Sequence, residues 1–121
     1  MKNWIFKILR PGEWKPNQNS RTYAGAPVDV GDGYIHFSTI DQLQETADKY
    51  FADELVVHII AFAASAWADG LRWEPSRGGQ LFPHLYEPLD MTLAAENWTL
   101  EKKESAQFDI TTVSLWAQNH D

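Results

Sequence analysis

The sequence predicts a single α+β domain with several short strands and one clear helix. Three observations lead to this fold class. Short runs of bulky and β-branched residues recur along the chain, one segment has helical periodicity, and proline or glycine turn signals separate them. The chain has 121 residues, of which 44% are hydrophobic, and this is enough for one packed core.

The first elements follow in order from the N-terminus. The bulky, alternating run Trp4–Leu9 predicts a strand, which Pro11 and Gly12 end. Residues 13–33 carry three turn signals, so they predict a long loop with room for one short helical turn. The run YIHFS at residues 34–38 predicts the second strand.

The main helix is predicted over residues 40–51. Thr39 suits the N-cap position, and Gln42 three residues later completes a capping box. One face of such a helix would carry the apolar side chains of Ile40, Leu43, Ala47, Tyr50 and Phe51. The segment is therefore amphipathic and predicts packing against a sheet.

The second half of the chain predicts further short elements. Glu54–Phe62 is a continuous β-branched run, which is typical of a central strand buried on both faces. Residues 63–70 predict a short helical turn closed by Gly70. The remaining expectations are strands at 71–74 and 95–102, a loop at 75–84, a return to the sheet at 84–90 and an edge strand at Phe108–Trp116.

Charge and composition exclude several classes. The net charge of −7 weighs against binding to nucleic acid and to anionic membrane surfaces, although a local basic pocket remains compatible with it. No apolar run approaches the ~18 residues of a membrane span. The absence of cysteine excludes disulfides and thiolate chemistry. The N-terminal apolar run is too short for a signal peptide, so a cytoplasmic location is the simplest expectation.

The first candidate site residue is His36, between the second strand and the main helix. A helix N-terminus offers unpaired N–H groups and a partial positive charge, which suit anionic or polyhydroxyl ligands. Ser38 and Thr39 lie at the same terminus. The alternative is structural, with His36 bracing the turn and Ser38 and Thr39 only capping the helix.

A second candidate cluster lies between residues 72 and 86. It brings together Arg72, Trp73, Glu74, Arg77, His84 and Tyr86. An arginine fork suits phosphate or carboxylate, a glutamate can stabilise a cation or take a proton, and aromatic rings can stack on a planar ligand. The alternative is a packed loop with an internal Arg77–Glu74 pair.

Other kinds of site have little support. His58 lies within an apolar run and His120 in the C-terminal tail, so both predict structural roles. A zinc site from His36, His84 and a carboxylate lacks the usual histidine spacing, so no metal is expected. The chain has no GxSxG, GxGxxG or P-loop motif.

Two long stretches together resemble a known family. They are YAGAPVDVGDGYIHFST, followed by DQLQETADKYF, and LRWEPSRGGQLFPHLY. They look like the small bacterial proteins of the domain-of-unknown-function 952 family, over about residues 4–100. The resemblance implies one family domain at 1–100 and a C-terminal extension at 101–121, with the expected edge strand packed on the same domain.

The resemblance also implies a fold similar to that of ADP-ribosyltransferases, with two small antiparallel sheets framing a cleft. IHFSTIDQL looks like the opening motif of some members of that superfamily, in which the histidine holds a ribose hydroxyl of NAD. His36 and Thr39 match this motif. The other candidates are Trp73 or Tyr86 for stacking, Arg72 or Arg77 for phosphate and Glu74 for the catalytic glutamate.

Three hypotheses follow for function. The first is an enzyme that uses NAD or ADP-ribose, with His36 and Glu74 catalytic and Thr39, Ser38, Trp73, Arg77, His84 and Tyr86 binding the ligand. The second is a binding module that holds a nucleotide, sugar phosphate or peptide in the same cleft without turnover. The third is an interaction protein, whose unknown partner would dock on its acidic surface or on residues 101–121.

Overall fold

The fold consists of two three-stranded antiparallel sheets and a few helices, in a computed structural model that describes residues 3–102 and 107–121. The strand orders are β1-β3-β6 and β2-β5-β4. This confirms the predicted α+β class with two small antiparallel sheets. In these two ranges no helix is long and apolar enough to cross a membrane.

The first sheet contains three strands that the sequence predicts. β1 (Trp4–Leu9) and β6 (Glu96–Glu101) flank β3 (Val56–Ala63), which is the central strand and is largely buried. The side chains of β1 alternate between two hydrophobic clusters. Ile5 and Leu9 pack in one, and Phe6 and Ile8 pack in the other. Lys7 therefore shares the face of Ile5 and Leu9.

The second sheet is smaller and carries most of the candidate residues. β2 (Ile35–His36) pairs with β5 (Leu81–Leu85), and β5 pairs with β4 (Leu71–Pro75). The pairing places His36 directly opposite His84. Two backbone hydrogen bonds between Phe6 and Ser38, of 2.8 and 2.9 Å, join the two sheets.

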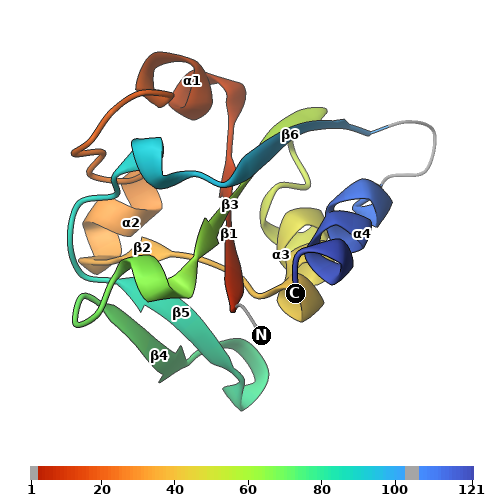
Figure 1. Cartoon of the computed structure of the whole chain (residues 1–121). Helices are drawn as coiled ribbons and strands as arrows, with labels where there is room; N and C mark the ends of the chain where they lie inside the picture. Colours follow the sequence, from red (N-terminus) through yellow and green to blue (C-terminus); the bar gives the residue numbers. More distant parts are fainter. Residues whose placement is uncertain (1–2, 103–106) are drawn as a thin grey trace.

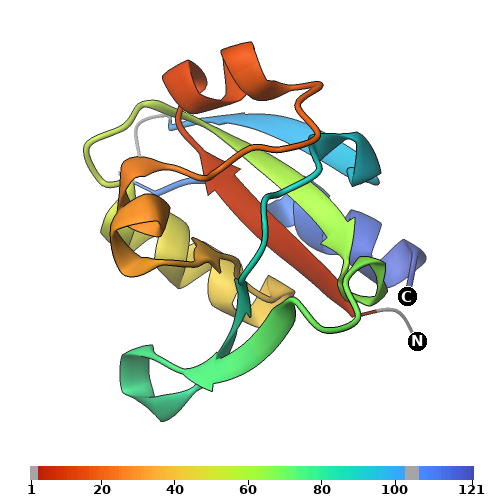
Figure 2. The same ribbon diagram turned by 90° about the vertical axis from the view of Figure 1, so that its left-hand side faces the viewer.

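The helices cover opposite faces of the first sheet, as Figures 1 and 2 show. α3 (Ile40–Tyr50) and α4 (Thr111–Asn119) lie on one face, and the second sheet and α2 (Pro27–Asp32) lie on the other. The α3 prediction is confirmed, since Leu43 and Ala47 are fully buried. Its capping is also as expected, because the Thr39 backbone N–H donates to Gln42 Oε1 at 3.0 Å.

The C-terminal segment corrects one prediction. Phe108–Trp116 was expected to form an edge strand, but the chain forms helix α4 from Thr111. Just before the helix, Asp109 accepts hydrogen bonds from the backbone and hydroxyl of Thr111 at 2.9 and 2.6 Å. Val113 and Ala117 then pack in the core at helical spacing. The division of the chain at residue 100 stays a prediction.

The long loop at residues 13–33 is more helical than expected. It contains part of α1 (Pro11–Trp14), the 3₁₀ turn η1 (Lys15–Asn17) and α2. α2 has proline at its first position, and the Ala26 N–H donates to Asp29 Oδ2 at 2.8 Å. Gly33 ends it with φ of 86°, which favours glycine.

Smaller corrections concern the other turns. The predicted loop at 75–84 contains the 3₁₀ turn η3 (Arg77–Gly79) and most of β5. The helical turn expected over 63–70 is a three-residue 3₁₀ turn, η2 (Ala64–Ala66), and Gly70 does not close it. A further 3₁₀ turn, η4 (Met91–Leu93), precedes β6.

Candidate functional site

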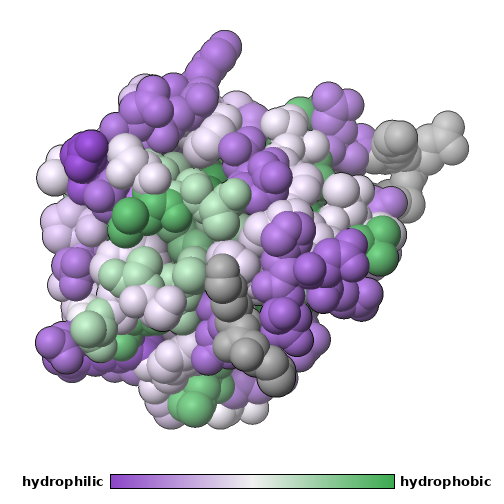
Figure 3. All heavy atoms as spheres, in the orientation of Figure 1, coloured by the Kyte–Doolittle hydropathy of each residue, from purple (hydrophilic) through white to green (hydrophobic). Residues whose placement is uncertain are grey.

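A cavity of about 500 Å³ lies between β1, α2, α3 and the second sheet. Its walls include Lys7, Asp29, Tyr34, His36, Arg77 and His84. The face of the molecule in Figure 3 is largely hydrophilic, with apolar residues gathered toward its left half. The cavity combines charged groups with aromatic rings, and ligand sites are often built in this way.

Asp29 is the buried centre of the site. Its fully buried carboxylate accepts from Lys7 Nζ at 2.8 Å, from the Ala26 and His36 backbone N–H groups at 2.8 and 3.1 Å, and from His36 Nδ1 at 2.6 Å. Burial alone raises the pKa of Asp29, but the His36 hydrogen bond and the Lys7 charge outweigh it and hold the pKa well below its usual range. Asp29 is therefore ionised when the protein is folded.

This carboxylate fixes the ring of His36. An ionised carboxylate only accepts hydrogen bonds, so His36 Nδ1 carries the proton that faces Asp29. The second ring nitrogen, Nε2, lies 3.0 Å from Oδ2 of Asp32, whose side chain is half exposed at the end of α2. His36 thus presents Nε2 at the wall of the cavity, on the side away from the core.

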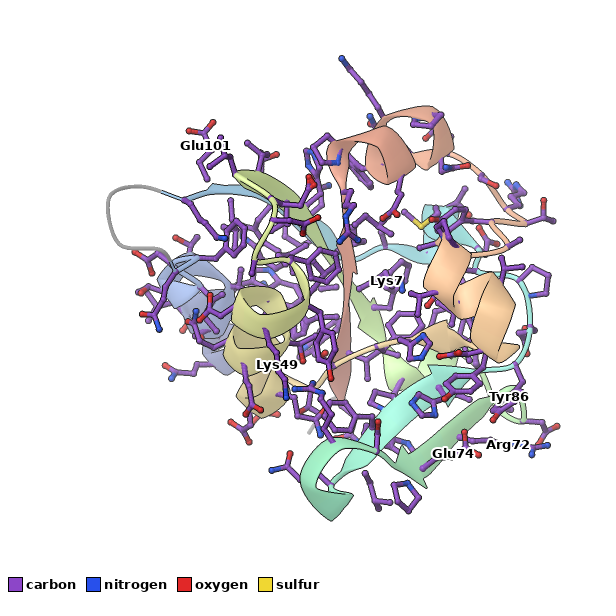
Figure 4. All side chains as sticks on the ribbon, turned by 180° about the vertical axis from the view of Figure 1, so that it is seen from behind. Lys7, Lys49, Arg72, Glu74, Tyr86 and Glu101 are labelled. Carbon is purple, nitrogen blue, oxygen red and sulfur yellow. The ribbon has the colours of Figure 1, made fainter. Side chains whose placement is uncertain are left out.

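Lys7 provides the charge that balances Asp29. It is almost completely buried, and its Nζ also donates to the His36 carbonyl at 3.0 Å. Figure 4 shows it between β1 and α2. A buried lysine needs such a partner, because an unpaired ammonium in the core is very costly. The Lys7–Asp29 pair therefore ties β1 to α2 and sets the position of His36.

A second histidine–carboxylate pair lies on the neighbouring strands. Glu74 Oε1 accepts from His84 Nδ1 at 2.8 Å and from the Tyr86 hydroxyl at 2.7 Å. These bonds, the Tyr86 bond first, lower the pKa of Glu74, and the bond to Glu74 raises the pKa of Tyr86. Figure 4 shows Glu74 and Tyr86 beside Arg72, whose guanidinium lies 4.9 Å from the Tyr86 ring.

The ring of Tyr34 lies against the rings of both His36 and His84. Its ring centroid lies 4.7 Å from that of His36 and 4.1 Å from that of His84. Burial, and then the charges of Asp32 and Glu74, raise the pKa of Tyr34, so its hydroxyl stays protonated. Together the three rings make a continuous aromatic surface beside the cavity.

Arg77 lies at another part of the cavity wall. Its guanidinium is held between the rings of Tyr50 and Phe82, at 4.9 and 4.7 Å, and donates to Thr46 Oγ1 at 2.5 Å. Its remaining pair, with the exposed Glu45, is long at 3.4 Å. These contacts hold the guanidinium in place, and a guanidinium fork suits the recognition of phosphate and carboxylate.

The structure brings half of the predicted site residues to the cavity and places the rest around it. Lining residues include His36, Ser38, Arg77 and His84. Glu74 and Tyr86 are bonded to each other beside His84, Thr39 caps α3, and Trp73 is about two-fifths exposed on β4. Among the described residues, these last four are not on the cavity lining. Their functional roles stay predictions.

Sequence reasoning missed Lys7, Asp29, Asp32 and Tyr34 as site residues. Two signals were present. Lys7 interrupts an apolar strand, which indicates a buried partner, and Asp29 follows Pro27 at the third position of a helix, where carboxylates are favoured. In the part of the chain that the structure describes, no group of three or more histidine or acidic side chains is arranged to hold a metal ion.

The fold and the cavity together define a small α+β protein with a histidine–carboxylate cleft. The profile of the family described as "Protein of unknown function (DUF952)" matches residues 8–96. The chain therefore belongs to the DUF952 family. No match is found among curated proteins.

The chain is also similar to solved structures. The chain is similar to the crystal structure of protein CC0527 from Caulobacter crescentus, a structural-genomics target, with a TM-score of 0.84 and 34% identity over 91% of this chain and 96% of that one. A double mutant of CC0527 gives the same values. Its solution NMR structure gives a TM-score of 0.79 at 34% identity, over 91% and 95% of the two chains.

Proposed function

We propose that this chain binds a small nucleotide-type ligand in the cavity, with NAD or ADP-ribose as the first ligands to test. The observation that carries the proposal is the buried Lys7–Asp29 pair, which holds His36 with Nε2 toward the cavity. A protein rarely places an ion pair in its core only for stability, because the desolvation cost offsets most of the gain. Nε2 would bond a ribose hydroxyl.

Arg77 would bind the phosphate of this ligand. Its ion pair with Glu45 is long, and the Glu45 side chain is exposed. Such pairs contribute only about 0–1 kcal/mol to stability. A phosphate could displace Glu45 and gain charge-assisted hydrogen bonds from a guanidinium that Tyr50, Phe82 and Thr46 already hold in place. The ligand would thus span the cavity from His36 to Arg77.

In the enzymatic form of this proposal, the ligand undergoes glycosyl or ADP-ribosyl transfer. His36 would orient the ribose and Glu74 would stabilise the positive charge that develops on it. Thr39 and Ser38 would support the ribose, and the rings of Trp73, His84 or Tyr86 would contact the base. NAD would then be a substrate.

A second candidate is a binding module without turnover. It is favoured because Glu74 already accepts hydrogen bonds from His84 and Tyr86 and is not on the cavity lining. Electrostatic stabilisation requires the charge to face the reacting atom. If Glu74 keeps these bonds with ligand present, the cleft holds a nucleotide or sugar phosphate but does not cleave it.

Ligand-observed NMR tests the shared part of both candidates. The purified protein is screened against NAD, ADP-ribose, AMP, nicotinamide and phosphate, and the screen is repeated with His36→Ala and Arg77→Ala. His58→Ala is the matched control, because His58 lies on β3 against Trp14 and is not on the cavity lining. We expect binding that His36→Ala and Arg77→Ala abolish and the control retains.

The outcomes separate the candidates. Binding of NAD with release of nicotinamide, detected by mass spectrometry, supports the enzyme, and binding without product supports the binding module. A folded protein that binds none of these ligands, or binds them equally well in His36→Ala, contradicts the proposal.

A further inference from the structure

We propose that His36 and His84 form a general base and general acid pair, and that the substrate class is a ribonucleotide phosphodiester. This inference rests on the proposed function, because it uses the same ribose and phosphate positions. It goes further by naming a second proton-transferring residue and the kind of bond that breaks. His84 would be a catalytic residue, and Glu74 a positioning residue that acts through it.

The two histidines are placed as a pair by the second sheet. His36 and His84 are directly opposite each other on antiparallel strands, so their side chains project from the same face. Their ring centroids are 5.5 Å apart, at 70°. Both line the cavity. Neighbouring histidines at this separation can reach two oxygens of one reacting centre, each by a hydrogen bond of about 2.6–3.2 Å.

The two rings are held in the same way. Each Nδ1 contacts a carboxylate, Asp29 at 2.6 Å for His36 and Glu74 at 2.8 Å for His84. A carboxylate that accepts from Nδ1 orients the ring and leaves Nε2 for proton transfer. The side chain of His84 is only 4% exposed, and it lines the cavity. A buried histidine oriented in this way suits chemistry better than packing.

The leaving group distinguishes the possible substrates. When the glycosidic bond of NAD breaks, nicotinamide leaves as a neutral molecule and takes up no proton, so a general acid adds nothing there. An alkoxide that leaves phosphorus needs a proton in the transition state. A second oriented histidine beside the first therefore favours a phosphodiester over NAD as the substrate.

The proposed step balances in atoms and protons. Once Asp32 is displaced and Nε2 has lost its proton to solvent, His36 Nε2 takes the proton of the ribose 2′-hydroxyl. The oxygen of this hydroxyl attacks the adjacent phosphorus and forms a new P–O bond. The bond from phosphorus to the 5′-oxygen breaks, and His84 Nε2–H donates its proton to that oxygen. The products are a 2′,3′-cyclic phosphate and a free 5′-hydroxyl, and solvent returns the two histidines to their starting states.

The charged and titratable groups around the pair fit these roles. His36 faces Asp29 and Asp32 from α2, and Lys7 from β1 contacts its carbonyl. His84 faces Glu74, and Tyr34 lies against both rings. Asp32 would leave Nε2 when the ribose binds. Arg77 would hold the non-bridging phosphate oxygens.

The test uses the dinucleotide uridylyl-(3′→5′)-adenosine with the full chain, followed by ³¹P NMR. We expect conversion to the cyclic phosphate with a bell-shaped pH dependence, and a loss of at least about a hundredfold in His84→Gln and in His36→Gln. His58→Gln should cleave at the wild-type rate. The analogue without the 2′-hydroxyl should bind but stay intact.

Glu74→Gln separates catalysis from folding, because the Glu74 side chain is 33% exposed on the edge strand β4 and glutamine keeps its size. We expect it to cleave about tenfold more slowly and to shift the limb of the pH profile that reports the acid. An unchanged profile, or wild-type cleavage in a folded His84→Gln, overturns the proposal.

Binding measurements distinguish a failure of this proposal from a failure of the proposed function. If the dinucleotide and ADP-ribose bind but no cleavage occurs, the acid–base pair is wrong and the nucleotide cleft stands. If neither binds to the folded protein, both proposals are wrong.

Discussion

Asp29 contributes both to the stability of the protein and to the geometry of the site. Its carboxylate is buried, and the cost of burying it is offset by Lys7 and by bonds from Ala26 and His36. The same bonds fix α2 against β1 and hold the ring of His36. A change at this residue should therefore affect folding and ligand binding together.

Asp29→Asn should destabilise the protein by about 3–5 kcal/mol, because Lys7 would be left as a buried charge without its partner. Chemical denaturation with urea measures the change. Asp32→Asn is the matched control, since the Asp32 side chain is 48% exposed, and we expect it to change stability by less than about 1 kcal/mol. Similar losses in the two variants would contradict the role given to Asp29.

Asp29 should also make stability depend on pH in the acid range. Its pKa is lower in the folded protein than the usual 3.8, so below that value the unfolded chain binds a proton that the folded one does not. Its contribution is complete above the unfolded pKa and is lost as the pH falls, with a slope of up to about 1.4 kcal/mol per pH unit. Urea denaturation at several acid pH values should show a smaller slope in Asp29→Asn than in the wild type.

Asp32 should compete with the ligand for His36. Its Oδ2 lies 3.0 Å from Nε2, where we place a ribose hydroxyl, and its charge repels phosphate. Asp32→Asn should therefore bind ADP-ribose more tightly, by about fivefold, which corresponds to the roughly 1 kcal/mol of an exposed charge pair. Isothermal titration calorimetry measures this, and weaker binding would mean that Asp32 contacts the ligand favourably.

Among single residues, the sequence indicated several that line the cavity but not the buried Lys7–Asp29 pair. His36 and Arg77 could be found because a histidine before a helix and an arginine before two glycines are visible locally, and His84 lies in the same short cluster as Arg77. The Lys7–Asp29 pair joins residues that are 22 positions apart, so no local pattern shows it. It depends on how β1 and α2 pack.

Among the elements, α3 shows how local signals can define a helix and α4 how they can be overlooked. The Thr39 and Gln42 cap and the apolar spacing predicted α3 within one residue. In α4 the β-branched residues favoured a strand, but Val113, Trp116 and Ala117 follow helical spacing. The packing of the apolar helix face, and not the strand preference of the β-branched residues, makes this segment a helix.

Gln42 connects α3 to the second sheet. Its Oε1 accepts from Thr39 and its Nε2 donates to the Leu81 carbonyl at 2.8 Å, next to the Arg77 turn. Gln42→Ala should cost about 1–3 kcal/mol, because a partly buried carbonyl loses its donor and the helix loses part of its cap. Thermal denaturation measures the loss. Lys49→Ala on the exposed face should stay within about 0.5 kcal/mol, and an equal loss there would contradict this role.

At the scale of the whole molecule, the first sheet separates two cores. One core lies on the side of α2 and the second sheet, and α3 and α4 cover the other. The cavity forms at the β1 edge of the first sheet, where α2, the second sheet and α3 all contribute to its lining. The strand identities could be predicted, but the opposition of His36 and His84 could not. That contact depends on pairing between strands that are almost fifty residues apart, and sequence periodicity does not report it.

The C-terminal segment should be part of the cooperative fold. Phe108 is buried in the core cluster of α3 and α4, so Phe108→Ala should destabilise the protein by about 3–5 kcal/mol. Leu115→Ala is the control, because Leu115 is 53% exposed on α4 in the same C-terminal segment, and it should cost less than about 0.5 kcal/mol. If Phe108→Ala unfolds like the wild type, this segment does not contribute to the core.

The most direct test of the central claim is a ¹⁵N-resolved NMR titration of the full chain with ADP-ribose. We expect saturable shifts at Tyr34, His36, Arg77 and His84, which line the cavity, and none in α4. His36→Ala should abolish these shifts while the rest of the spectrum stays that of the folded protein. The absence of saturable shifts in the wild type, or shifts confined to α4, would contradict the nucleotide cleft.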